Sequence, residues 1–171
     1  VVEACKSGAS GSAVVNRPLA ATPRFYYSLL ANTSSPAILD GGYIDFDASF
    51  TNGVDILDVR KSPNFGENFG IRSANTDLVV ERRALITATD TFFYKISGMR
   101  AMAYQLNFTT DVLENTGLIA VLEDKYLGSS TPVSLSVATT YNFTVNATAE
   151  SKAANRFRIV FKPGIALPVT F

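Results

Sequence analysis

The chain has 171 residues, of which 47% are hydrophobic and 18% charged, and its 15 Lys and Arg residues balance its 15 Asp and Glu residues. This composition predicts one folded domain with a sizeable core, and the zero formal charge argues against partners such as nucleic acid or anionic lipid. The chain has no His and only one cysteine, Cys5. These two facts exclude Ser-His-Asp and Cys-His catalytic sets, zinc sites built on His or paired Cys, and an internal disulfide.

The first 23 residues are rich in Ser, Gly and Ala and contain turn signals at Arg17-Pro18 and Thr22-Pro23. This composition predicts a leader or linker, or an edge segment exchanged with another chain, in which Val14 and Val15 supply a short strand. No signal peptide and no apolar stretch long enough to insert into a membrane are visible. We expect a β-domain over residues 24–163, followed by a linker at 164–171, and therefore a piece of a larger protein.

The first half of the domain alternates in short extended runs. Arg24 to Ala31 predicts a strand, and Tyr43 to Phe50 predicts another with its even-numbered residues inward. Asn52-Gly53 predicts a hairpin turn, with a return strand at Val54 to Arg60. Residues 61–70 are too rich in Gly, Asn and Pro for a helix and indicate a loop.

The second half continues the pattern. Further strands are expected at residues 77–82, 91–97, 101–109, 118–122 and 133–137. The stretch Thr139 to Lys162 then predicts a closing hairpin. Its inward side chains would be Tyr141, Phe143, Val145, Phe157, Ile159 and Phe161, and its water-facing ones Arg156, Arg158 and Lys162.

Roughly ten to twelve short strands, no convincing helical period and no internal repeat predict an all-β fold. Within that class we expect an antiparallel two-sheet β-sandwich of the jelly-roll or immunoglobulin-like kind.

Calcium is the metal that the sequence offers most readily. Five acidic residues cluster around the expected first hairpin: Asp40, Asp45, Asp47, Asp55 and Asp58. Carboxylate oxygens on adjacent loops suit calcium, but no D-x-D-x-D-G loop is present. Solvated carboxylates on a strand face are the favoured interpretation, and no other cofactor motif is found.

Carbohydrate is the ligand that the aromatic residues suggest. Nineteen aromatic residues include two consecutive runs, Phe25-Tyr26-Tyr27 and Phe92-Phe93-Tyr94, in which alternation turns some rings outward. An exposed aromatic row would stack on sugar rings. Because the chain lacks Trp, cross-strand packing is the favoured interpretation. Four asparagines, Asn32, Asn107, Asn142 and Asn146, begin N-x-S/T triplets of the kind that chance supplies in a Thr-rich chain.

Several motifs of the second half resemble a β-module of exported Bacteroidetes surface proteins. They include L-V-V-E-R-R (78–83), A-T-D-T-F-F-Y-K-I (88–96), G-L-I-A-V-L-E-D-K-Y-L-G (117–128), Y-N-F-T-V (141–145) and N-R-F-R-I-V-F (155–161). In those proteins the module precedes a C-terminal type IX secretion sorting domain, and L-P-V-T-F (167–171) resembles the start of that next segment. The resemblance implies a location outside the outer membrane, secreted or on the cell surface. It also implies contact with the export machinery through a domain that this sequence lacks.

These observations predict a non-catalytic module of a secreted or surface protein, acting as an adhesin, a filament subunit or a spacer. Its partners would be neighbouring domains or copies of itself, joined through sheet edges. The alternative is a carbohydrate-binding accessory module of a secreted hydrolase, with a glycan as its ligand.

Overall fold

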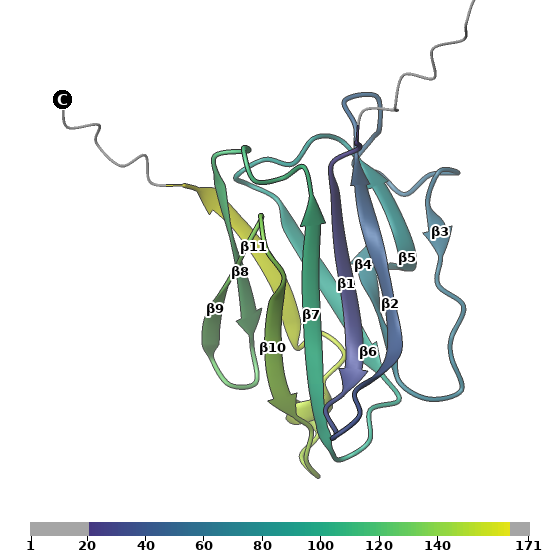
Figure 1. The fold of residues 1–171 in the computed structure, drawn as a ribbon. Coiled ribbons are helices and arrows are strands. Elements are labelled where there is room, and N and C mark those ends of the chain that lie inside the picture. Colours follow the sequence, from purple (N-terminus) through teal and green to yellow (C-terminus); the bar gives the residue numbers. More distant parts are fainter. Residues whose placement is uncertain (1–20, 165–171) are drawn as a thin grey trace, which may run out of the picture.

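A computed structural model describes residues 21–164, and this part of the chain is all-β, as the sequence predicts (Figure 1). Its eleven strands and one short 3-10 helix, η1, have the following bounds: β1 Arg24–Ala31, β2 Ala37–Phe46, β3 Val59–Arg60, β4 Asn68–Ser73, β5 Thr76–Arg83, β6 Thr91–Ser97, β7 Ala103–Asp111, β8 Leu118–Asp124, β9 Ser129–Val133, β10 Thr139–Thr144, η1 Glu150–Lys152 and β11 Phe157–Pro163.

The strands form one hydrogen-bonded path rather than two separate sheets. Its order is β10-β7-β1-β2-β5-β4-β6-β11-β8-β9, with β3 on the other edge of β5. β5 joins two halves of this path, which are β10-β7-β1-β2 and β4-β6-β11-β8-β9. Its C-terminal part pairs parallel with β2, and its N-terminal part pairs antiparallel with β4. The path bends back at β5, which brings β9 and β10 to the same side of the molecule in a nearly closed barrel (Figure 1).

Aromatic side chains fill the space between the two halves. Phe25 of β1 lies 5.9 Å from Phe92 of β6 and 6.4 Å from Phe161 of β11, between ring centroids. Tyr27 of β1 similarly lies 5.2 Å from Tyr94 of β6. Burying each such ring contributes about 1.5–3 kcal/mol, so these contacts help substantially to hold the halves together.

Clear alternation predicts strands well in this chain. The bounds expected for β1 and β6 are confirmed, and β5, β7, β8, β10 and β11 differ from expectation by only a few residues. The first three residues of β4, 68–70, fall in the stretch expected to be loop at 61–70, and β9 begins and ends earlier than the strand predicted at 133–137.

The hairpin predicted at Asn52-Gly53 is wrong. β2 ends at Phe46, and the chain up to β3 is turns and loop, without a return strand from Val54. Neither Asn52 nor Gly53 has the positive φ that a two-residue hairpin turn requires. The Asn52 side chain instead accepts a hydrogen bond from the Ala84 N–H at 3.2 Å, which docks the loop against the end of β5.

The predicted closing hairpin is also wrong, although both of its strands exist. β10 pairs with β7, whereas β11 lies between β6 and β8. The connection through η1 therefore crosses from one half of the fold to the other. Period two reveals which face of a strand is buried, but it does not reveal the neighbouring strand.

Several predictions fall outside residues 21–164. These are most of the leader at 1–23 with Cys5, Val14 and Val15, and the linker at 164–171 apart from Gly164. Within residues 21–164, no helix has the length and apolar composition needed to cross a membrane.

Candidate functional site

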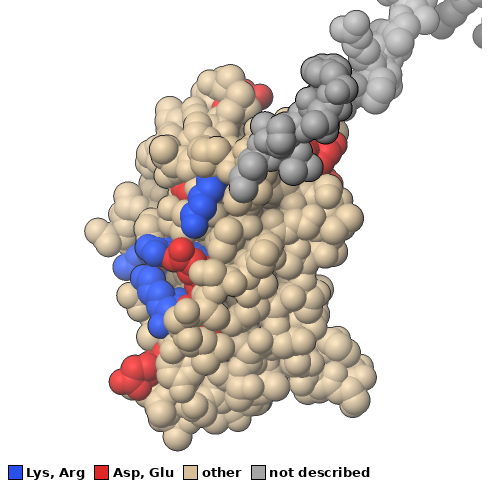
Figure 2. Space-filling view, turned by 90° about the vertical axis from the view of Figure 1, so that its left-hand side faces the viewer, with Lys and Arg blue, Asp and Glu red and all other residues tan. Residues whose placement is uncertain are grey.

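The two end strands of the sheet, β9 and β10, form an open edge. Within residues 21–164 each pairs with a single neighbour, β8 and β7 respectively. Residues 126–149, which contain both strands, include no Asp, Glu, Lys or Arg. Figure 2 views this side of the molecule: the Lys and Arg side chains gather along one margin, and most of the remaining surface carries no charge. Exposed edge strands are ordinarily protected by charged residues or by Pro; β9 carries Pro132, whereas β10 has neither, so β10 lacks the usual defence against pairing.

The edge of β10 offers free backbone groups. Val145 donates its N–H to Met102 O at 3.0 Å, on the β7 side. Because residues alternate along an antiparallel strand, Thr140 and Asn142 turn their N–H and C=O groups away from β7. The Thr144 carbonyl, which belongs to the same set, is occupied because it accepts a hydrogen bond from Arg156. The groups available for a new strand are therefore those of Thr140 and Asn142.

A hollow of about 400 Å³ lies beside this edge. It is lined by the first residues of β8, by Pro132 and Val133 of β9, and by the loop that leads into β10 at Thr139. Ile119 is exposed here. We call the gap between the end strands β9 and β10 the seam. At this end the seam is open, and its β8 side is mainly apolar.

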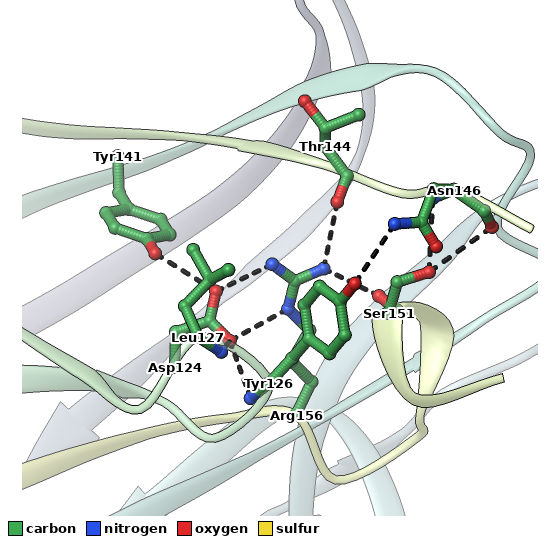
Figure 3. A network of polar contacts seen from close by, with 8 residues as sticks. All are labelled: Asp124, Tyr126, Leu127, Tyr141, Thr144, Asn146, Ser151 and Arg156. Carbon is green, nitrogen blue, oxygen red and sulfur yellow. Dashed lines mark hydrogen bonds and ion pairs between the residues drawn. The ribbon is translucent and has the colours of Figure 1, made fainter. Parts of the chain in front are cut away.

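A buried ion pair closes the other end of the seam (Figure 3). Arg156 is 1% exposed and donates two hydrogen bonds to Asp124, from Nε to Oδ1 at 2.9 Å and from Nη2 to Oδ2 at 2.7 Å. Its Nη1 donates to the carbonyls of Thr144 at 3.1 Å and of Ser151 at 2.6 Å. One guanidinium therefore ties β8 to the end of β10 and to η1.

Aromatic groups enclose this ion pair. The rings of Tyr126, Phe143 and Phe157 each lie 4.9 Å from the guanidinium carbon of Arg156, at cation–π distance. The Tyr141 hydroxyl donates to Asp124 Oδ2 at 3.0 Å. Burial alone would raise the pKa of Asp124, but the hydrogen bonds and positive charge of Arg156 outweigh it and lower that pKa.

The prediction that Arg156 faces water is wrong. Alternation applies only inside a strand, and Arg156 lies in the turn before β11, where its N–H bonds Ala153 O at 3.1 Å. Arg158, which lies within the strand, is half-buried on the outer face, and Lys162 is exposed. A buried Arg would have been detectable only as a partner for Asp124, and sequence spacing does not show that pairing.

Two of the five calcium candidates are buried in ion pairs. Asp40 binds Lys61 Nζ at 2.6 Å. Asp45, which was expected on the solvent face, is buried between Arg24 and Arg82. Their oxygens already have cationic partners, so neither presents a free ligand.

The other three candidates shape the loop between β2 and β3. Asp47 accepts hydrogen bonds from the N–H and hydroxyl of Ser49, and Asp55 accepts one from the Leu57 N–H at 2.8 Å. Asp58 accepts one from the Asp55 N–H at 2.9 Å. Within residues 21–164, no group of three or more His, Cys, Asp or Glu side chains is arranged to hold a metal ion.

The two aromatic runs divide as alternation requires. Phe25 and Tyr27, like Phe92 and Tyr94, are core residues. Phe93 is 46% exposed on the outer face of β6. Strand β6 therefore presents one outward ring, Phe93, and not a row of exposed rings.

No protein-family model matches the chain, and neither the curated proteins nor the solved structures with which it was compared give a match.

Proposed function

We propose that this chain is a non-catalytic structural or adhesive module that assembles with copies of itself through the open edge of its sheet. The observation that carries the proposal is the pair of end strands, β9 and β10, within a segment that has no charged residue. An extended segment that hydrogen-bonds to Thr140 and Asn142 would continue the sheet, and its apolar side chains would enter the adjoining hollow.

The occupant that we propose is the N-terminal segment, residues 1–20, of a second copy. This segment contains Val14-Val15 among small and polar residues, and it has no Asp or Glu after Glu3. An extended strand advances about 3.3 Å per residue, so five residues are enough to cover the free length of β10. Pairing in one direction from copy to copy would produce a filament rather than a closed dimer.

The setting that we propose is the exterior of the cell, after export by type IX secretion. Its support is the resemblance of the strand motifs between residues 78 and 161 to modules of exported surface proteins. In this proposal the nearly closed barrel is a flattened variant of the two-layer sandwich, with β5 as the bridge between the layers.

The first experiment removes residues 1–20 and keeps Pro23, because the Pro23 carbonyl accepts a hydrogen bond from the Phe46 N–H at 3.0 Å. The full chain should associate progressively with concentration in light scattering and sedimentation, and the truncated chain should stay monomeric. A full chain that remains monomeric at high concentration would refute the proposal.

A point variant tests the edge itself. Thr140→Pro removes an outward N–H without removing a hydrogen bond to β7, so the fold should survive and assembly should be lost. Thr140→Val keeps the N–H and serves as the matched control, which should assemble like the parent. Equal assembly of both variants would show that β10 is not the contact.

A further inference from the structure

A groove of about 590 Å³ lies on the outer face of the sheet, where β4, β6 and the start of β11 meet. The exposed ring of Phe93 forms part of its floor. One wall is the Ala74–Asn75 turn between β4 and β5, in which both residues have positive φ. Lys125 and the Ala154–Asn155 segment line it as well. The groove borders the outer side of the buried Arg156 pair, because Phe157 also lines it, and it shares no strand with the open edge.

The charged residues that line this groove are all cationic. They are Arg72, Lys95 and Lys125, and no Asp or Glu contributes to the lining. Beside the groove, the Asp77 carboxylate binds both Arg72 at 2.7 Å and Lys95 at 2.5 Å. Burial would raise the pKa of Asp77, but the hydrogen bonds from Lys95 and Arg72 outweigh it and keep the carboxylate ionised. Two cations thus share one anion, and Lys125 adds a further positive charge.

The strand register places the aromatic ring between two arginines. Phe93 pairs with Arg158 of β11, and the pairing of Ile71 with Tyr94 puts Arg72 beside Phe93 on the other strand. Neighbouring strands are about 4.8 Å apart, so the two arginine positions are separated by about 10 Å across the ring. Both arginines have an acidic partner, Glu123 for Arg158 and Asp77 for Arg72, so the excess positive charge of the groove comes from Lys125 and from Lys95, which shares Asp77 with Arg72.

A second, smaller hollow of about 100 Å³ continues this face along β4 and β6. Lys95 lines both hollows, and the second one is also lined by Lys61, by the Asp77 carboxylate that Lys95 binds, and by the polar Asn68 and Ser97. A Cβ atom at Gly70 would lie 2.9 Å from the Leu78 carbonyl oxygen as well as 2.7 Å from Lys61 Cδ, so glycine is the residue that fits this part of the lining without a backbone shift. The two hollows together would accommodate several units of an extended polymer.

We propose that this groove binds an acidic polysaccharide. A sugar ring would stack on Phe93, carboxylate or sulfate groups would pair with Arg72, Lys95 and Lys125, and hydroxyl groups would bond the carboxamides of Asn75 and Asn155. A saccharide fits better than a single-stranded nucleic acid because Phe93 is a single exposed ring, whereas proteins that bind single strands stack successive bases on several rings. This site is independent of assembly through β10.

The experiment measures binding of the full chain to immobilised polygalacturonate, a uronate polymer, and to heparin, a sulfated one. Neutral laminarin, polyglutamate and double-stranded DNA are the comparison probes. We expect retention on at least one acidic polysaccharide, weakening as salt rises, and little on the three comparison probes. A preference for polygalacturonate would identify carboxylate as the anionic group that the groove binds, and a preference for heparin would identify sulfate.

Two variants connect the binding to the groove. Phe93→Ala should weaken binding about five- to tenfold with an unchanged salt dependence, because it removes stacking but no charge. Lys125→Glu should weaken it by about tenfold or more at low salt and by less at high salt. Their matched controls are Phe65→Ala, an exposed ring elsewhere, and Arg60→Glu on β3, and both should bind like the parent.

Circular dichroism and thermal melting would verify that all four variants fold. Equal retention of DNA or polyglutamate, equal retention of laminarin, or undiminished binding by both Phe93→Ala and Lys125→Glu would each overturn the proposal.

Discussion

Two ion pairs join β8 to the N-terminal end of β11, and they differ mainly in where they lie. Asp124 and Arg156 are at most 1% exposed and close the seam from inside. Their neighbours Glu123 and Arg158 lie on the outer face, with side chains 25% and 37% exposed. The residue types are nearly the same and the N–O distances are similar, 2.7 and 2.5 Å. The two ion pairs therefore differ mainly in how deeply they are buried.

Burial makes the inner pair a structural requirement. A buried guanidinium needs a partner for each donor, and Arg156 finds them on Asp124, Thr144 and Ser151. The outer pair competes with water and contributes little to folding. The fold should therefore tolerate the loss of Arg158, whereas it should not tolerate the loss of Arg156.

The largest expected effect follows from removing the inner arginine. Arg156→Met leaves Asp124 as an uncompensated buried charge and should lower the free energy of unfolding by about 3–5 kcal/mol. Urea denaturation would measure this loss. Arg158→Met is the matched control and should cost about 1 kcal/mol or less. Similar losses for the two variants would mean that burial does not decide how much an ion pair stabilises this fold.

An intermediate effect is expected from acid. The pKa of Asp124 is lowered in the folded state, so its contribution to stability is complete above the unfolded pKa of about 3.9 and is lost as pH falls through the folded value. The free energy of unfolding of the parent should therefore decline below about pH 4. Arg156→Met should show a shallower decline there, since the charge that lowers this pKa is gone. A steeper decline would contradict this account of Asp124.

The smallest expected effect concerns salt. At an ionic strength of 1 M, charges are screened within about 3 Å at exposed positions, so the difference between Arg158→Met and the parent should nearly vanish. The Arg156→Met difference should persist, because solvent ions do not reach the buried pair. Urea denaturation of both variants at low and high salt measures this contrast. A loss of the Arg156 effect in salt would mean that water enters the seam.

The two arginines also show how far the sequence allows prediction. Alternation placed both of them on the water-facing side, which is correct for Arg158 and wrong for Arg156. Strand identity in Arg24–Ala31 and Thr91–Ser97 follows from side chains close in sequence, so it was predictable. Pairing of β10 with β7, or of Asp124 with Arg156, depends on contacts between distant residues that periodicity does not encode.

The candidate sites were partly predictable in the same sense. An outward ring in Phe92-Phe93-Tyr94 follows from period two, and the structure shows which one it is. The cations around Phe93 come from β4, β6 and the turn after β8, so only the strand order assembles them. The absence of charge from residues 126–149 is visible in the sequence. Only the strand order shows that the two strands in this segment, β9 and β10, are the end strands of the sheet.

The position of β11 has a consequence for biosynthesis. It is the last strand of the described chain, yet it lies between β6 and β8 and is one of the two hydrogen-bonded neighbours of each. A nascent chain that has reached only residue 156 has two exposed inner edges and lacks Phe157, Ile159 and Phe161 from its core. The domain therefore cannot complete its folding until its final strand has left the ribosome. A chain that must be threaded through a membrane before it folds would gain time from this arrangement.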